Sequence, residues 1–137
     1  MKYCLSFGII ILISLSSCRE DVIDPHNLGG NINEPVEVST NSSYVFSING
    51  NSISYSIVYS TNLISLDNNI YITLTDYNAG TISVTLYDPQ GVAVFDYSVN
   101  SNVDNNTFLI PSQEIDKIRF SFSEFTGKFR CEIAPTD

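Results

Sequence analysis

The segment from Thr81 to Val99 reads TISVTLYDPQGVAVFDYSV and decides the fold class. Apolar and polar residues alternate on both sides of a central Asp88-Pro89-Gln90-Gly91, which is typical of two strands joined by a turn. Proline presets φ at the first corner and glycine relaxes the exit of such a turn. Pairing Asp88 with Gly91 gives one register, in which Leu86 faces Ala93, Val84 faces Phe95 and Ile82 faces Tyr97. Because this register gathers all six apolar residues on one face, the segment predicts an antiparallel hairpin.

Similar signals predict a hairpin upstream. Asn49-Gly50 lies between the strand-like segments 44–48 and 53–59, and Asn-Gly is the preferred pair for a type I′ turn. Such a turn would place Phe46 opposite Ile53.

A last hairpin is predicted from residues 116–123 and 128–133 around the turn Glu124-Phe125-Thr126-Gly127. Its register would set Phe120 opposite Cys131 on the inner face. The other two cysteines are Cys4, in the predicted signal peptide, and Cys18, which is predicted to be lipidated, so neither is expected to pair with Cys131. Cys131 is therefore expected to be a buried free thiol.

With further short strands at 70–77 and 108–110, seven or eight strands are expected in roughly 95 residues, enough for one core. The sequence therefore predicts an all-β fold, an antiparallel β-sandwich of immunoglobulin-like type. The hairpin around Asp88–Gly91 and the closing hairpin with Thr126-Gly127-Lys128-Phe129 resemble small immunoglobulin-like sandwiches of unknown function in secreted proteins of the Bacteroidota. That resemblance implies no functional residues, because a fold does not fix a function.

The N-terminus has the features of an export signal. Lys2 precedes a mostly apolar run from Leu5 to Leu15, which is too short to span a bilayer and has the length of a signal peptide. Leu15-Ser16-Ser17-Cys18 resembles the cleavage motif of bacterial lipoproteins. The resemblance implies that residues 1–17 are removed and that Cys18 carries acyl chains as a membrane anchor.

The residues after Cys18 indicate where the anchored protein is displayed. Arg19, Glu20 and Asp21 are similar to the export signal that sends Bacteroides-group lipoproteins to the outer face of the outer membrane. Residues 18–42 combine Pro, Gly and acidic residues and are predicted to form a flexible tether before a domain at 43–135. A lipid-anchored protein of the outer membrane, facing the cell surface, is thus expected.

Charge excludes one class of partner. The chain has a formal net charge of -9, and no Lys or Arg occurs between Glu20 and Asp116. Nucleic acid binding requires clustered cations, so it is not expected.

The sequence favours a non-catalytic role without cofactor or metal. The single histidine, His26, lies in the predicted tether, where no scaffold would orient it for nucleophilic or zinc chemistry. The acidic loops Asp67-Asn68-Asn69 and Asp104-Asn105-Asn106 offer oxygen ligands that suit calcium, but Asp and Asn are also ordinary turn residues.

Two surface features leave the binding partner open. Tyr71, Tyr77 and Tyr87, with Thr73, Thr75 and Thr85, alternate along two predicted strands and offer rings and hydroxyls to a glycan. Lys117, Arg119, Lys128 and Arg130 are expected to form a basic strand face partly neutralised by Glu132, with Arg119 opposite Glu132.

The expected function is a binding or structural accessory module. One alternative is a glycan-binding module of a nutrient-uptake system. The other is an adhesion or assembly subunit that pairs the edge of a strand with another envelope protein.

Overall fold

A computed structural model describes residues 30–136 of the chain, and these residues form six antiparallel strands and no helix. The strands are β1 (Val36–Ser39), β2 (Tyr44–Ser60), β3 (Asn68–Tyr87), β4 (Ala93–Val99), β5 (Val103–Ile110) and β6 (Lys117–Pro135). No helix in this part of the chain is long and apolar enough to cross a membrane. The predicted all-β antiparallel sandwich is confirmed, with six strands in place of seven or eight.

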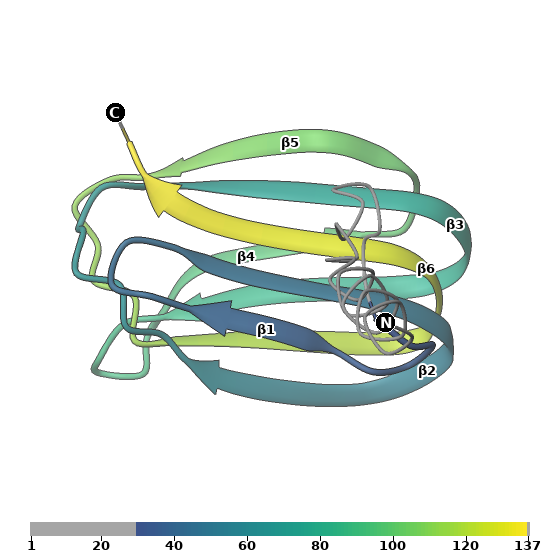
Figure 1. The fold of residues 1–137 in the computed structure, drawn as a ribbon. Helices are drawn as coiled ribbons and strands as arrows, with labels where there is room; N and C mark the ends of the chain where they lie inside the picture. Colours follow the sequence, from purple (N-terminus) through teal and green to yellow (C-terminus); the bar gives the residue numbers. More distant parts are fainter. Residues whose placement is uncertain (1–29, 137) are drawn as a thin grey trace, which may run out of the picture.

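Three long strands, β2, β3 and β6, bend at one end of the molecule and run on into the opposite layer (Figure 1). Each bend contains a non-glycine residue with positive φ: Ser52 in β2, Asp76 in β3 and Glu124 in β6. The pairing register also shifts at each bend, as expected where a bulge twists a strand out of plane.

The bends divide the strands between two layers. The first layer contains β1, residues 44–50 of β2, residues 127–135 of β6, residues 68–75 of β3, and β5, in that order. The second layer contains residues 53–60 of β2, residues 117–125 of β6, residues 81–87 of β3, and β4. Strand β6 is thus the central strand, flanked by β2 and β3, in both layers.

The core lies between the inward faces of the two layers. Phe46 of the first layer and Phe120 of the second layer stack with ring centroids 3.9 Å apart, and both are fully buried. At the side of the sandwich formed by β4 and β5, the core is closed by Phe95, Tyr97 and Phe108, whose rings contact one another. Each large apolar side chain buried in this way contributes about 1.5–3 kcal/mol to folding.

The hairpins predicted at Asn49-Gly50 and at Glu124–Gly127 are wrong, because β2 and β6 each continue through these residues as one strand. Phe46 pairs with Cys131 of β6 and not with Ile53. Gly50 serves close packing and not a turn: a Cβ atom there would lie 2.6 Å from Cδ1 of Phe125.

The closing register is wrong for the same reason, since Phe120 and Cys131 belong to one strand and to different layers. The buried free thiol expected at Cys131 is confirmed.

The hairpin at Asp88–Gly91 is confirmed, with a different register. Asp88 Oδ1 accepts a hydrogen bond from the backbone N–H of Val92 at 2.7 Å, and Gly91 N–H donates to the Asp88 carbonyl at 3.0 Å. The observed pairs are Leu86 with Phe95, Val84 with Tyr97 and Ile82 with Val99. The register is shifted by two residues from the predicted one, because Asp88 bonds to Val92 at the turn and the bulge after Leu86 adds one more residue of β4. The predicted inward face is therefore kept except at Ala93, which is exposed.

Strand β1 lies inside the range predicted to be a flexible tether. It pairs with the first half of β2, so the folded domain begins before residue 43.

Candidate functional site

The predicted lipid anchor falls outside the part of the chain that the structure describes. Cys18 and the display signal Arg19, Glu20 and Asp21 belong to residues 1–29, and they stay predictions.

The tyrosines predicted for glycan binding do not share one face. Tyr71 lies in the first layer, where it pairs with Glu132, whereas Tyr87 lies in the second layer, beyond the bend of β3. Tyr77 lies in the bend itself, and its hydroxyl donates to the Gly80 carbonyl at 3.0 Å. The continuous ribbon of rings and hydroxyls expected from the sequence is therefore divided by the bend.

The predicted basic face is divided in the same way. Lys117 and Arg119 lie on the second layer, whereas Lys128 and Arg130 lie on the first. Glu132 is two residues from Arg130 on the same strand and accepts a hydrogen bond from it at 2.9 Å. The pairing of Arg119 with Glu132 is thus wrong, and the Arg119 guanidinium instead lies 5.2 Å from the ring centroid of Tyr87.

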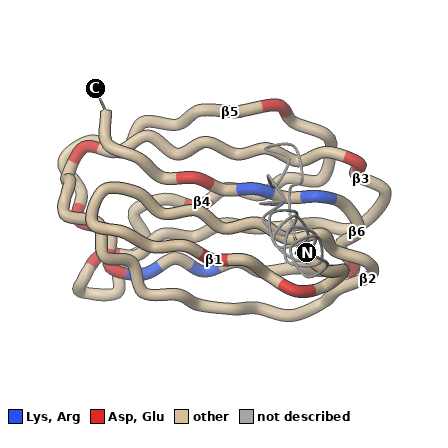
Figure 2. The backbone as a smooth tube through the Cα atoms, in the orientation of Figure 1, with Lys and Arg blue, Asp and Glu red and all other residues tan. Residues whose placement is uncertain are grey.

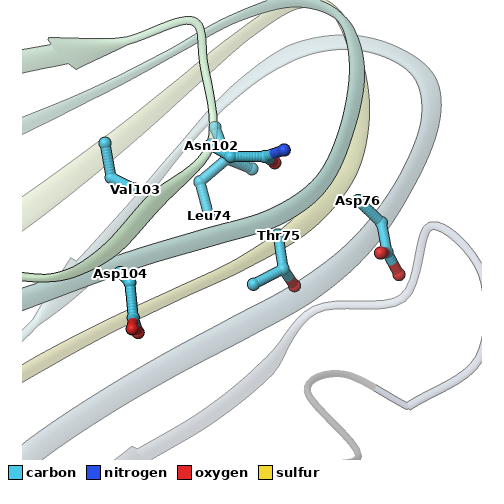
Figure 3. A pocket seen from close by; sticks show the side chains of 6 residues that line it. All are labelled: Leu74, Thr75, Asp76, Asn102, Val103 and Asp104. Atoms are coloured by element: carbon cyan, nitrogen blue, oxygen red, sulfur yellow. The ribbon is translucent and has the colours of Figure 1, made fainter.

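A depression of about 520 Å³ lies beside the bend of β3 and is lined by Leu74, Thr75, Asp76, Asn102, Val103 and Asp104 (Figure 3). In this view the carboxylates of Asp76 and Asp104 lie on opposite sides of Thr75. Asp76 is paired with Lys128 at 2.8 Å, and Asn102 Oδ1 accepts the Tyr77 backbone N–H at 2.9 Å. These polar groups hold the bend in place and do not converge on a common point.

The two loops considered for calcium also have structural partners. In the first loop, Asp67 Oδ1 accepts the backbone N–H of Ser112 at 2.8 Å, and Asn68 donates to the Ser65 carbonyl at 2.8 Å. In the second loop, the Asn106 side chain donates to the Tyr97 hydroxyl at 3.2 Å. Among residues 30–136, no group of three His, Cys, Asp or Glu side chains is placed to hold a metal ion.

The most distinctive surface is an edge of the second layer. We call residues 53–60 of β2 the bare edge, because within residues 30–136 they pair only with β6, whereas residues 44–47 of the same strand pair with both β6 and β1. A strand that is paired on one side leaves every second set of backbone N–H and C=O groups open to another strand.

The side chains of the bare edge suit a strand-pairing surface. Tyr55, Ile57 and Tyr59 face inward but are only half-buried, because nothing in the described chain covers them from the open side. The outward set consists of Ser54, Ser56, Val58 and Ser60, which are exposed. No charged residue occurs from Val38 to Leu66, so the whole of β2 is uncharged in an acidic protein (Figure 2).

The other three edges carry features that discourage pairing with another chain. Strand β1 has four residues, follows Pro35, and turns Glu37 to the inner face beside Phe46. Inward charges, prolines and short lengths are the usual protections of sheet edges.

Strands β4 and β5 are protected by charge and irregularity. β4 carries the exposed Asp96 and starts at a bulge. β5 carries the exposed Asp104, has a positive φ at Asn105, and is followed by Pro111. Among the four edges of the two layers, only the bare edge carries no charged residue, although it too starts at a bulge, between Ile53 and Tyr55.

The bare edge also has a hydroxyl-rich outer face beside it. Ser56, Ser121, Ser83 and Ser98 lie in one row across the four strands of the second layer. Ser56 donates to Ser121 at 2.8 Å, and the hydroxyls of Ser83 and Ser98 are 2.6 Å apart. This row is uncharged, and Arg119 lies in the next row with Val58 and Thr85.

The Glu37 carboxylate of β1 affects two tyrosines of β2, in the opening between β1 and the bare edge. Burial, and then the nearby Glu37 carboxylate, raises the pKa of Tyr59 above its ordinary value of 10.0. The same two causes raise the pKa of Tyr44 much further, and its buried hydroxyl has no hydrogen-bond partner. The neutral phenols are therefore strongly favoured on the inner side of this opening.

Sequence reasoning named strand-edge pairing as an alternative but did not find this edge. Which strands flank a given segment depends on long-range pairing, which the local pattern does not reveal. The absence of charge from Val38 to Leu66 was the available signal.

Comparisons with known proteins give distant structural likenesses. No protein-family model matches the chain, and no curated protein matches it in sequence. One similar solved structure is described as "Bacillus endospore appendages form a novel family of disulfide-linked pili", with a TM-score of 0.45 and 17% identity over 80% of this chain and 99% of that chain.

A second similar structure is the enzymatically active domain of tailspike protein 4 of bacteriophage CBA120. Its TM-score is 0.26, with 17% identity over 73% of this chain. The match spans 14% of the tailspike chain.

Proposed function

We propose that this protein is a lipid-anchored, non-catalytic module of a bacterial outer membrane, displayed at the cell surface, which takes part in assembly by pairing the bare edge of β2 with another strand. The anchoring part rests on Leu15-Ser16-Ser17-Cys18 and on Arg19, Glu20 and Asp21. The assembly part rests on the second layer of the sandwich.

The observation that carries the assembly role is the contrast between the bare edge and the three protected edges. The bare edge is uncharged, and its pairing with β6 is regular from Tyr55 to Ser60. An edge strand of this kind with Tyr, Ile and Val accepts an added strand, with main-chain hydrogen bonds supplying affinity. Its half-buried Tyr55, Ile57 and Tyr59 would become covered on pairing, which adds a hydrophobic contribution.

The anchor is tested with the full chain expressed in a Bacteroides-group host. Cys18→Ser should move the protein out of the membrane fraction and abolish labelling by a radioactive fatty acid. Cys4→Ser is the matched control, because residue 4 leaves with the predicted signal peptide, and it should change neither readout. A Cys18→Ser protein that still takes up fatty acid contradicts the anchor.

Surface display is tested by protease treatment of intact cells. The wild-type domain should be degraded, and the double variant Glu20→Gln with Asp21→Asn should be more protected. Survival of the wild-type domain under conditions that remove a known surface protein contradicts display at the surface.

The assembly role is tested with a pair of valines. Val58 on the bare edge and Val38 on β1 are both 54% exposed and both face outward. Val58→Lys places a charge on the pairing surface and should reduce the fraction of detergent-extracted full chain in complexes, measured by sedimentation, about three- to tenfold. Val38→Lys should leave that fraction unchanged. Equal effects of the two variants would argue against the bare edge as the assembly surface.

Glycan binding is a second candidate, favoured by the hydroxyl row and by the neighbouring Tyr87 and Arg119 on the outer face of the second layer. Hydroxyls and an aromatic ring on one flat face suit a sugar. A glycan array probed with the full chain tests it, with Tyr87→Ala expected to remove binding and Tyr71→Ala, on the other layer, expected to keep it. An array on which the wild-type protein binds nothing rejects this candidate.

A further inference from the structure

We propose that the strand which pairs with the bare edge is the same segment of a second copy of this chain, in antiparallel orientation around a two-fold axis at Ile57. This inference rests on the proposed assembly role of the bare edge and names its partner.

The sequence of the edge is nearly the same in both directions. Residues 54–60 read Ser-Tyr-Ser-Ile-Val-Tyr-Ser. Turning the segment about Ile57 places Ser54 opposite Ser60, Tyr55 opposite Tyr59 and Ile57 opposite itself. Only Ser56 meets a different residue, Val58. An isologous interface requires such self-complementarity, because the same segment of both copies forms the contact: if residue i faces residue j of the second copy, residue j faces residue i.

The same register preserves the two faces of the layer. Tyr55, Ile57 and Tyr59 face inward in each copy, and the pairing joins these inward residues only with one another. Aromatic cross-strand pairs are among the more favourable contacts between neighbouring strands. The two second layers, each with four strands, would then form one continuous layer in which the half-buried tyrosines cover each other.

The absence of charge on the bare edge allows a second copy to approach there. The chain carries 15 acidic and 6 basic residues, so two copies repel one another over most of their surface. The bare edge is uncharged, and the neighbouring strand β6 carries Lys117 and Arg119 on its outer face.

The proposed register also brings opposite charges into one row. Lys117 pairs with Ser60, and Ser60 would face Ser54 of the second copy, whose hydroxyl accepts the Glu124 backbone N–H at 2.8 Å. Lys117 of one copy and Glu124 of the other would therefore lie about three strand spacings, or roughly 14 Å, apart, and the symmetry repeats this pair. At this separation, and with Lys117 already paired with Asp116 at 3.2 Å, the attraction is largely screened at physiological salt, so the register rests on the symmetry of the segment.

The interface is small. Pairing of seven residues from each copy buries less than the 1,200–2,000 Å² or so of a standard stable interface. The dimer is consequently weak in dilute solution and depends on a high local concentration, which anchoring in one membrane supplies.

Disulfide trapping tests the register directly. In the full chain on cell membranes, Ile57→Cys places two thiols directly across the axis, where Cβ atoms of facing residues lie about 4.5–5.5 Å apart, a separation close to that of a disulfide. Oxidation with copper phenanthroline and dissolved oxygen should trap most of this variant as a covalent dimer. Cys131 is fully buried and should not contribute.

Ser54→Cys and Ser60→Cys provide the matched controls. Each residue lies about six residues, or roughly 20 Å, from its own symmetry mate, so neither variant alone should form dimers. Co-expression of the two variants should restore a dimer that contains one of each, because Ser54 faces Ser60.

The outcomes separate the partner from the function. Dimers from Ile57→Cys and from the mixed pair, but not from either control alone, support self-pairing. Dimers from all single variants indicate a parallel arrangement and overturn the register. If no variant forms a dimer while Val58→Lys still disrupts the complexes, the edge binds a different protein and self-pairing is overturned while the assembly role stands. If Val58→Lys also has no effect, both proposals fail.

Discussion

The two halves of β2 have the same alternating pattern and different surroundings. In the first half, Tyr44, Phe46 and Ile48 are fully buried between the layers, with β1 on one side and β6 on the other. In the second half, Tyr55 and Ile57 face the same interior but stay half-buried, because no strand of the described chain covers the open side. Burial on a β-strand therefore depends on its neighbours as much as on its own side chains.

The largest expected effect contrasts the cores of the two halves. Phe46→Ala should lower the free energy of unfolding by about 3–5 kcal/mol, because it removes a fully buried ring stacked on Phe120. Ile57→Ala should cost less, about 1–2 kcal/mol, because its side chain is only partly buried. Urea denaturation followed by fluorescence measures both. Equal losses would show that the bare half is as well packed as the covered half.

The next effect concerns the junction between the halves. Gly50→Ala should destabilise the fold by about 1–3 kcal/mol, because the added Cβ would lie 2.6 Å from the Phe125 ring and force it to move. Thermal unfolding measures the loss. Gly91→Ala is the control for crowding, since no atom lies within 4 Å of its Cβ position, although its φ of 80° adds backbone strain. A Gly50→Ala protein as stable as the wild type would contradict the close approach at the bend.

The Tyr44 hydroxyl tests whether water is excluded from the covered half of β2. Tyr44→Phe should raise stability by about 1–2 kcal/mol, because the Tyr44 hydroxyl is buried without a hydrogen-bond partner. Tyr59→Phe, in the open half, should leave stability within about 0.5 kcal/mol. Chemical denaturation of the two variants side by side gives the comparison. A loss of stability in Tyr44→Phe would reveal a partner for the hydroxyl, such as a bound water.

The smallest effect appears only at alkaline pH. Burial, and then Glu132, raises the pKa of the Cys131 thiol above its ordinary value of 9.0. The unfolded thiol therefore releases its proton first. The stabilising effect of the neutral thiol is complete below pH 9 and is lost as pH rises, at about 1.4 kcal/mol per pH unit.

The measurement is the pH dependence of unfolding between pH 8 and 10, with Cys131→Ala as the comparison. That variant is less stable at neutral pH but should lose less stability on going to pH 10. A thiol reagent added to the native protein should react with Cys131 only on unfolding. Rapid reaction in the folded state would show that the reagent reaches Cys131, which contradicts its burial in the core.

The sequence predicted the class of fold and one turn well, for local reasons. Asp88-Pro89-Gln90-Gly91 can form a tight turn and little else, so the hairpin there was predictable, as was the burial of Cys131 on an apolar face. The register of this hairpin was not predictable, because the bulge and the longer turn together shift it by two residues, which leaves the inward and outward faces unchanged.

The continuity of the long strands could not be read from the local pattern. Gly50 and Gly127 resemble turn residues, yet each lies where a strand bends and packs closely against an aromatic ring. Alternation looks the same on both sides of a bend and on both sides of a turn. The division of the tyrosines and of the basic residues between two layers follows from this one ambiguity.

The place of β6 has a consequence for synthesis. This strand lies between β2 and β3 in both layers but is the last of the six strands to be synthesised, so β2 lacks its main partner until residues 117–135 have been made. Until then only local pairs such as β1 with β2 and β3 with β4 can form. Dependence on such distant contacts slows folding. The nascent chain therefore has no closed core between its two layers until residues 117–135 are available.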